Sequence, residues 1–115
     1  MKKINTREKG GFYENISREY LVSKDFKILD NNFKCKLGEI DIIAIKNNVL
    51  HFIEVKYRNS DQYGHPLESI SSCKQRKIKK VANYYLTFIY KNEIDCSFDA
   101  LCILNNDIIY VENCF

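Results

Sequence analysis

Residues 38–58 read GEIDIIAIKNNVLHFIEVKYR, and this stretch decides the fold. Two runs rich in Ile and Val stand on either side of an Asn-Asn pair, which favours a tight turn. The stretch therefore predicts two neighbouring strands of a β-hairpin. Charged side chains (Asp41, Glu54 and Lys56) interrupt the two runs where the chain should be buried most deeply.

The turn fixes which residues face each other across the hairpin. If Lys46 lies opposite Val49, then Asp41 lies opposite Glu54. Their Cβ atoms would be about 5 Å apart, where like charges destabilise a strand pair. Lys56 shares their face, because side chains alternate along a strand. A shared proton, a basic side chain between the acids or a bound cation would relieve this repulsion.

The other face of the hairpin is apolar and predicts a packed surface. It carries Ile40, Ile42 and Ala44 against Val55, Ile53 and His51. On this face we expect His51 to be a core histidine with a hydrogen-bond partner rather than a general base. The packed face and the partly polar face together predict that only one side of the hairpin is fully buried.

The remaining elements follow from the periodicity of apolar residues. Residues 11–24 and 74–90 show helical spacing, with Ile89 among the apolar positions of the second helix. Residues 26–33 predict a strand before the hairpin, and residues 97–104 and 107–115 predict two strands after the second helix. The order αβββαββ predicts an α+β domain, with a mixed β-sheet flanked by helices.

Composition is that of one globular domain in a reducing compartment. The chain has 115 residues, 45% of them apolar, and no linker-like segment, so we expect a single domain over residues 1–115 with residues 1–8 frayed. The five cysteines are odd in number and never spaced as CxxC, which predicts free thiols and a cytoplasmic location. No apolar stretch is long enough to span a membrane, and we expect no membrane partner.

Two acids beside a lysine suit a hard divalent cation. Mg²⁺ binds carboxylate oxygens, backbone carbonyls and water. A neighbouring lysine can orient or deprotonate a metal-bound water, or stabilise charge on a phosphate. Asp41, Glu54 and Lys56 are therefore typical of a site that cleaves phosphodiesters with Mg²⁺, or with Mn²⁺ as a substitute. The alternative is a structural ion pair of the acids with Lys56 or Arg58.

Longer stretches of the chain resemble a known family. Asp41 followed by Glu54-Val55-Lys56 on the next strand resembles the (P)D...(D/E)xK signature of the restriction-endonuclease-like superfamily, although Ile40 stands in place of the proline. The segments GFYENISREYL, GEIDIIA, FIEVKYR, YGHPLESI, KQRKIKKVANYYL, SFDALCIL and ENCF resemble the YraN family, which is similar to archaeal Holliday junction resolvases. This resemblance covers residues 9–115 and implies the αβββαβ core of those nucleases.

The resemblance also implies a set of functional residues. In such nucleases one acid comes from the first helix, one from the second strand, and an acid and a lysine from the third. Glu14, Asp41, Glu54 and Lys56 fill these places, and the carbonyl of Val55 is the further metal ligand expected. The implied activity is that of a Mg²⁺-dependent endonuclease acting on DNA, including branched DNA.

Basic residues near this site predict contacts with the DNA backbone. Lys74 and Gln75 stand at the start of the second helix, Lys77 follows them, and Arg58 comes after the lysine of the signature. The alternative for the helix charges is the solvated side of an amphipathic helix. The net charge of +3 is too small to prove a nucleic-acid partner by itself.

Other functions stay open from the sequence. The chain could be a catalytically silent nucleic-acid-binding module on a nuclease scaffold, or a structural protein with an internal ion pair. By analogy with junction resolvases we expect a two-fold homodimer, and we expect no small-molecule cofactor. Asp99 matches a position of the family pattern and is expected to be a cap or hydrogen-bond acceptor, whereas His65 is given no role.

Overall fold

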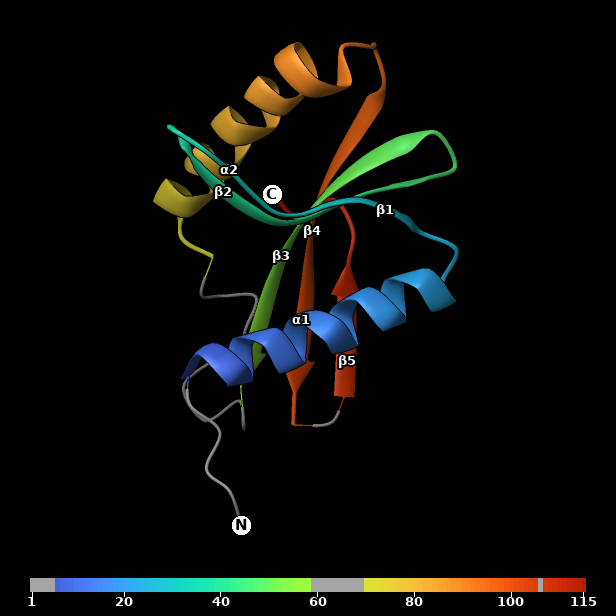
Figure 1. Cartoon of the computed structure of the whole chain (residues 1–115), viewed down its shortest axis with the longest axis vertical. Helices are drawn as coiled ribbons and strands as arrows, with labels where there is room; N and C mark the ends of the chain where they lie inside the picture. The colour runs from blue at the N-terminus through green and yellow to red at the C-terminus, as the bar shows by residue number, and fades with distance from the viewer. Residues whose placement is uncertain (1–5, 59–69, 106) are drawn as a thin grey trace.

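A single mixed sheet organises the chain, and a helix packs on each of its faces (Figure 1). The computed structural model describes residues 6–58, 70–105 and 107–115. The elements are α1 (Thr6–Ser23), β1 (Lys27–Cys35), β2 (Gly38–Lys46), β3 (Val49–Arg58), α2 (Ser72–Tyr85), the π-helical turn η2 (Leu86–Tyr90), β4 (Asp95–Leu104) and β5 (Asp107–Val111). Within the described residues the strand order is β1-β2-β3-β4-β5, and only β3 and β4 pair in parallel. The predicted α+β class and element order are confirmed.

The β2–β3 hairpin turns at the predicted position. Lys46 pairs with Val49, and the register continues to Ile42 and Ile53. Both asparagines of the turn have positive φ angles, 52° and 61°. Asn tolerates this left-handed region better than most residues, which is why an Asn-Asn pair can close a tight hairpin.

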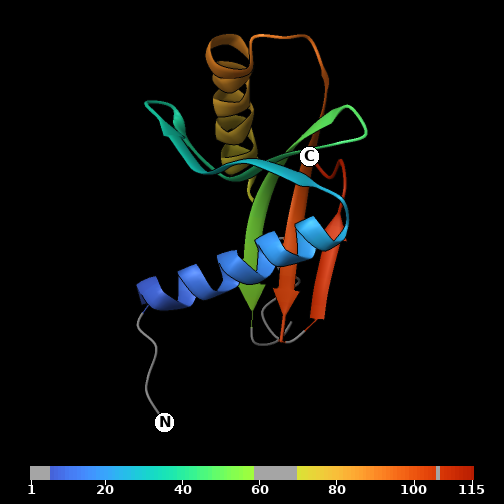
Figure 2. The ribbon, with the colours of Figure 1, turned by 45° about the vertical axis from the view of Figure 1, so that its right-hand side comes forward.

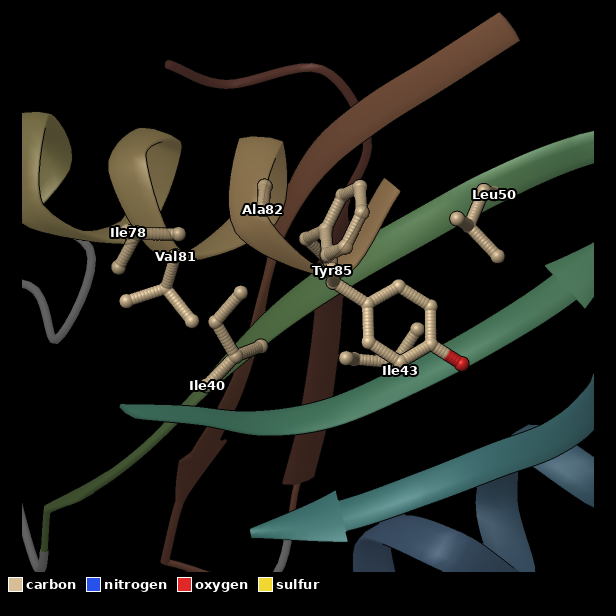
Figure 3. Close-up of a cluster of buried hydrophobic side chains, with 8 residues drawn as sticks. Ile40, Ile43, Leu50, Ile78, Val81, Ala82 and Tyr85 are labelled. Atoms are coloured by element: carbon tan, nitrogen blue, oxygen red, sulfur yellow. The ribbon is translucent and has the colours of Figure 1, made fainter. Parts of the chain in front are cut away.

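The α2 side of the sheet holds one hydrophobic core. Its buried members are Ile78, Val81, Ala82 and Tyr85 of α2 with Ile40, Ile43, Leu50 and Phe52 of the hairpin. Figure 3 shows the helix side chains lying over the hairpin strands. Burying these side chains removes apolar area from water at about 25 cal/mol per Å² and fixes α2 against β2 and β3.

The α1 side holds a second core of the same kind. It contains Leu21, Phe26, Ile42, Ala44, Ile53, Leu101 and Ile103. Successive residues of β3 thus contribute to opposite cores, as the alternation of a strand requires. Both faces of the hairpin are therefore packed, and the prediction that only one face is fully buried is wrong.

At one point along the β1–β2 pair, the alternation of side chains between the two faces of the sheet is interrupted. Ile40 packs in the α2 core whereas Ile42 packs in the α1 core, although strict alternation would put them on one face. Asn32, with φ of 52°, stands opposite Asp41 by the register of the flanking pairs. This left-handed residue lets the outer part of the β1–β2 hairpin turn toward α2 (Figure 2). The prediction that Ile40 shares the face of Ile42 is wrong for this reason.

The helices differ from the prediction at their ends. Helix α1 begins at Thr6, before the first apolar residue on which the prediction depended. The predicted second helix is α2 continued by η2, whose wider turn moves later residues out of helical phase. Ile89 is consequently 51% exposed instead of packed. None of the described helices is long and apolar enough to cross a membrane.

The last strand is shorter than predicted. It ends at Val111 rather than at residue 115, because the chain turns back toward β4. Asn113 adopts a φ of 53°, and the backbone N–H of Cys114 donates to the carbonyl of Phe98 at 2.8 Å.

A buried aspartate joins this C-terminal segment to the sheet. Asp99 is fully buried and accepts hydrogen bonds from Ser97 Oγ, Tyr110 OH and the backbone N–H of Asn113, and it is 2.6 Å from His51 Nδ1. Burial alone would raise the pKa of Asp99, but these hydrogen bonds hold it below its ordinary value. Asp99 is thus a hydrogen-bond acceptor, and His51 is a core histidine with a partner, as expected.

Candidate functional site

The predicted acid Asp41 lies where β2 separates from β3. Pairing between these strands ends at Ile42 and Ile53, one residue before Asp41. Beyond that point Asp41 Oδ2 accepts the backbone N–H of Val55 at 2.9 Å. The carboxylate therefore satisfies a β3 donor where the strand ladder stops, and this hydrogen bond fixes its position.

The charge of Asp41 is unfavourable in this position. Burial, and after it repulsion from Glu54, raise its pKa from 3.8 to about 7, while the Val55 N–H and Lys74 oppose the rise. The charges of the two acids thus interact, although the strand pairing that would put Asp41 directly opposite Glu54 stops one residue earlier, at Ile42 and Ile53. A proton or a cation at this position is favourable, because it would remove that repulsion.

Glu54 is neutralised by two lysines. Its side chain is only 5% exposed, and Oε1 lies 3.2 Å from Lys74 Nζ and 3.6 Å from Lys56 Nζ. Burial would lower the pKa of Lys74, but the attraction of Glu54, together with that of Asp41 and Glu39, raises the pKa above its ordinary value. Lys74 was predicted to bind DNA, and in this structure its partner is the acid of the signature.

Glu14 lies on the α1 side of the same point. Its Oε2 accepts a hydrogen bond from Asn32 Nδ2 at 3.2 Å. A cavity of about 100 Å³ is lined by Tyr13, Glu14, Asp41, Val55 and Tyr57. The rings of Tyr13 and Tyr57 stack 4.2 Å apart and form one wall. The structure therefore brings Glu14, Asp41 and Val55 to one cavity.

The donor atoms suit a hard divalent cation, but the arrangement is not a closed metal site. Among the described residues, no three His, Cys, Asp or Glu side chains are grouped to hold one ion. Carboxylates and a carbonyl are the ligands that Mg²⁺ takes, and the raised pKa of Asp41 marks negative charge that a cation would compensate. Glu14, Asp41 and the Val55 carbonyl are thus of the chemical kind that such an ion binds, whereas Glu54 is paired with two lysines.

Of the other predicted DNA contacts, Lys77 and Arg58 are exposed, whereas Gln75 is bonded to the backbone. Lys77 is exposed on α2. Arg58 is exposed at the end of β3, where its Nη1 donates to the carbonyl of Tyr57 at 2.8 Å. Gln75 Nε2 donates to the carbonyl of Ile70 at 3.0 Å and so fixes the start of α2. His65 lies outside the described residues.

Asn32 is the member of the site that sequence reasoning missed. It holds Glu14 through its amide, and its left-handed backbone bends the hairpin opposite Asp41. The only local signal was the tolerance of Asn for positive φ, and the strand pattern around it concealed that signal. Its role becomes visible only when α1 is packed against β1.

Comparison with known proteins matches most of the chain to one protein family. The profile of the uncharacterised protein family UPF0102 matches residues 13–103. A UPF0102 protein of Fusobacterium nucleatum is 43% identical over 110 residues, which cover 96% of this chain and 92% of the relative. One of Clostridium beijerinckii is 46% identical over 106 residues, covering 92% and 85%, and one of Caldanaerobacter subterraneus is 42% identical over 106 residues, covering 92% and 87%.

Proposed function

We propose that this chain, which belongs to the UPF0102 family, is a metal-dependent DNA endonuclease. The family includes the YraN proteins that the motifs of the chain resemble. It would hydrolyse phosphodiester bonds, with branched DNA such as a Holliday junction among its substrates. The observation that carries the proposal is the position of Asp41, whose carboxylate accepts the Val55 N–H and lines one cavity with Glu14 while its charge is repelled by Glu54. Repelling acids are costly to fold and need a functional or structural reason.

Each residue has a role in the proposed reaction. Glu14, Asp41, Glu54 and the carbonyl of Val55 would hold the ion. A bound Mg²⁺ would lower the pKa of a water molecule and neutralise charge on the phosphate. Lys56, whose side chain is 21% exposed, stands beside Glu54 and would stabilise the charge that develops on the attacked phosphate.

The proposed partner is DNA, bound along the positive side of α2. Lys77 is exposed on this helix, and Arg58 is exposed at the end of β3. Such side chains attract phosphates without reading sequence, which suits a nuclease that recognises the shape of its substrate. We further propose a homodimer, which would present one site to each of two strands, and a cytoplasmic location, in keeping with the five free thiols.

The test is cleavage of defined DNA structures. Four-way junctions, flaps and single strands should be incubated with the protein in Mg²⁺, in Mn²⁺ and in EDTA, beside a Lys56→Ala variant. We expect cleavage that requires the ion and falls by about 100-fold or more in the variant. Lys27→Ala is the matched control, because Lys27 is an exposed lysine at the start of β1, and it should cleave like the wild type.

Two results would contradict the proposal: no cleavage of any substrate, or equal cleavage by Lys56→Ala. A second function would then be favoured by the two lysines that already neutralise Glu54, namely a binding module without chemistry. Calorimetry separates the two, since a pure binder should not take up Mn²⁺ and should bind DNA equally well after Asp41→Asn.

A further inference from the structure

Two lysines from different elements share one carboxylate oxygen. Lys56 and Glu54 both belong to β3, whereas Lys74 reaches the same Oε1 from the first turn of α2. The Lys74 contact is the shorter, at 3.2 Å against 3.6 Å. Lys74 is also the more exposed, with 40% of its side chain accessible against 21% for Lys56. Lys74 is thus both the closer of the two lysines to Glu54 and the more accessible to solvent.

We propose that Lys74 occupies the place of the divalent ion at Glu54 and exchanges between two partners. Without the ion it neutralises Glu54; when the ion binds, Lys74 leaves Glu54 and contacts a phosphate of the DNA. This inference rests on the proposed function and deepens it, because it makes Lys74 a positioning residue that links ion binding to DNA binding.

Charge balance supports the exchange. Glu14, Asp41 and Glu54, the acids proposed to hold the ion, together carry at most three negative charges, and Lys56 and Lys74 supply two positive ones. A divalent ion added to this group would leave an excess of at least one positive charge at a poorly solvated point. Departure of Lys74 removes one positive charge and frees Glu54 Oε1, and a DNA phosphate gives the lysine a new partner.

The helix start makes the exchange local. The backbone N–H of Lys74 donates to Ser71 Oγ at 3.1 Å, which caps α2, and Gln75 holds the carbonyl of Ile70. These contacts fix the Lys74 backbone while its long side chain is free to rotate. No backbone movement is needed for Lys74 to change partners.

Titration of Mn²⁺ by calorimetry tests this without any measurement of cleavage. Lys74→Ala and Lys74→Gln should bind Mn²⁺ about ten-fold or more tightly than the wild type, because a cation that competes for Glu54 is removed. Lys80→Ala is the matched control: Lys80 is exposed on the same helix, and the variant should bind Mn²⁺ like the wild type. Two substitutions are used in case one of them fails to fold.

DNA binding gives the second readout. With Ca²⁺ in place of Mg²⁺, Lys74→Gln should lose at least about three-fold in affinity for a four-way junction, and in EDTA it should lose less. Wild-type binding of Mn²⁺ with equal or weaker binding by both Lys74 variants would overturn the exchange alone. No Mn²⁺ binding by the wild type or by either variant would overturn the exchange and the metal-dependent function together.

Discussion

Replacing Asp41 by Asn should stabilise the ion-free protein at neutral pH. The folded chain holds this carboxyl at a pKa of about 7, mainly through burial and the nearby charge of Glu54, against an ordinary value of 3.8. Between these two values the unfolded chain has lost the proton and the folded chain keeps it. Stability therefore falls as pH rises through this window, and the full cost is present above the folded pKa.

The size of the effect follows from the two pKa values. A difference of about 3 pKa units corresponds to about 4 kcal/mol as an upper value, at about 1.4 kcal/mol per unit. About 2 to 3 kcal/mol of this should be lost between pH 5 and pH 8. An Asn at position 41 has no charge to bury, and its amide oxygen can still accept the Val55 N–H.

Urea unfolding in EDTA, followed by circular dichroism from pH 5 to pH 8, measures this directly. The difference in free energy of unfolding between wild type and Asp41→Asn separates the effect of Asp41 from that of other titrating groups. This difference should grow as pH rises. Asp107→Asn, at an exposed acid of β5, should follow the wild-type curve in parallel. Parallel curves for wild type and Asp41→Asn, or a less stable Asp41→Asn at pH 8, would refute the reasoning.

Three further substitutions test the fold around the site, each by urea unfolding. Asp99→Asn should cost about 3 kcal/mol at pH 7, because a buried hydrogen-bonded charge is removed. Since the folded pKa is lowered, the wild-type advantage should begin to fall below about pH 4 and decline further as pH falls through the folded pKa. Equal stability at pH 7 would contradict this. Asn32→Ala should be less stable than Asn32→Gly by about 1 kcal/mol, since only Gly adopts the positive φ without strain; the reverse order would exclude a left-handed residue there. Ile78→Ala should cost about 2 to 5 kcal/mol, whereas Lys80→Ala, on the exposed side of the same helix, should change stability by less than about 0.5 kcal/mol. Similar losses for both would show that α2 does not pack as described.

The sequence predicts the parts of this fold that depend on local signals. The Asn-Asn turn and the alternating residues beside it determine the hairpin register, and helical spacing identifies α2 through Ile78 and Val81. The prediction for Ile89 is wrong because the π-helical turn has more residues per turn than an α-helix, which moves Ile89 out of the apolar stripe. No residue type signals such a turn.

The candidate site is less predictable because it depends on contacts between distant segments. Register alone placed Asp41 near Glu54, and the structure agrees that their charges interact. The contact of Lys74 with Glu54 forms only because α2 lies in the crossover between the parallel strands β3 and β4. An amphipathic pattern does not show that the Lys74 side chain points toward an acid instead of solvent. Asn32 was hidden for the same reason, since its partner Glu14 is 18 residues away on another element.

The change of facing at Asn32 and Asp41 has a consequence for how this protein tolerates mutation. The same short stretch is the point where the chain passes from one hydrophobic core to the other and the point where Asp41 accepts the Val55 N–H. A volume change in either core would thus tilt Asp41 relative to Val55 without touching either residue. We expect second-site suppressors of a damaged candidate site to map to interior aliphatic positions on both sides of the sheet.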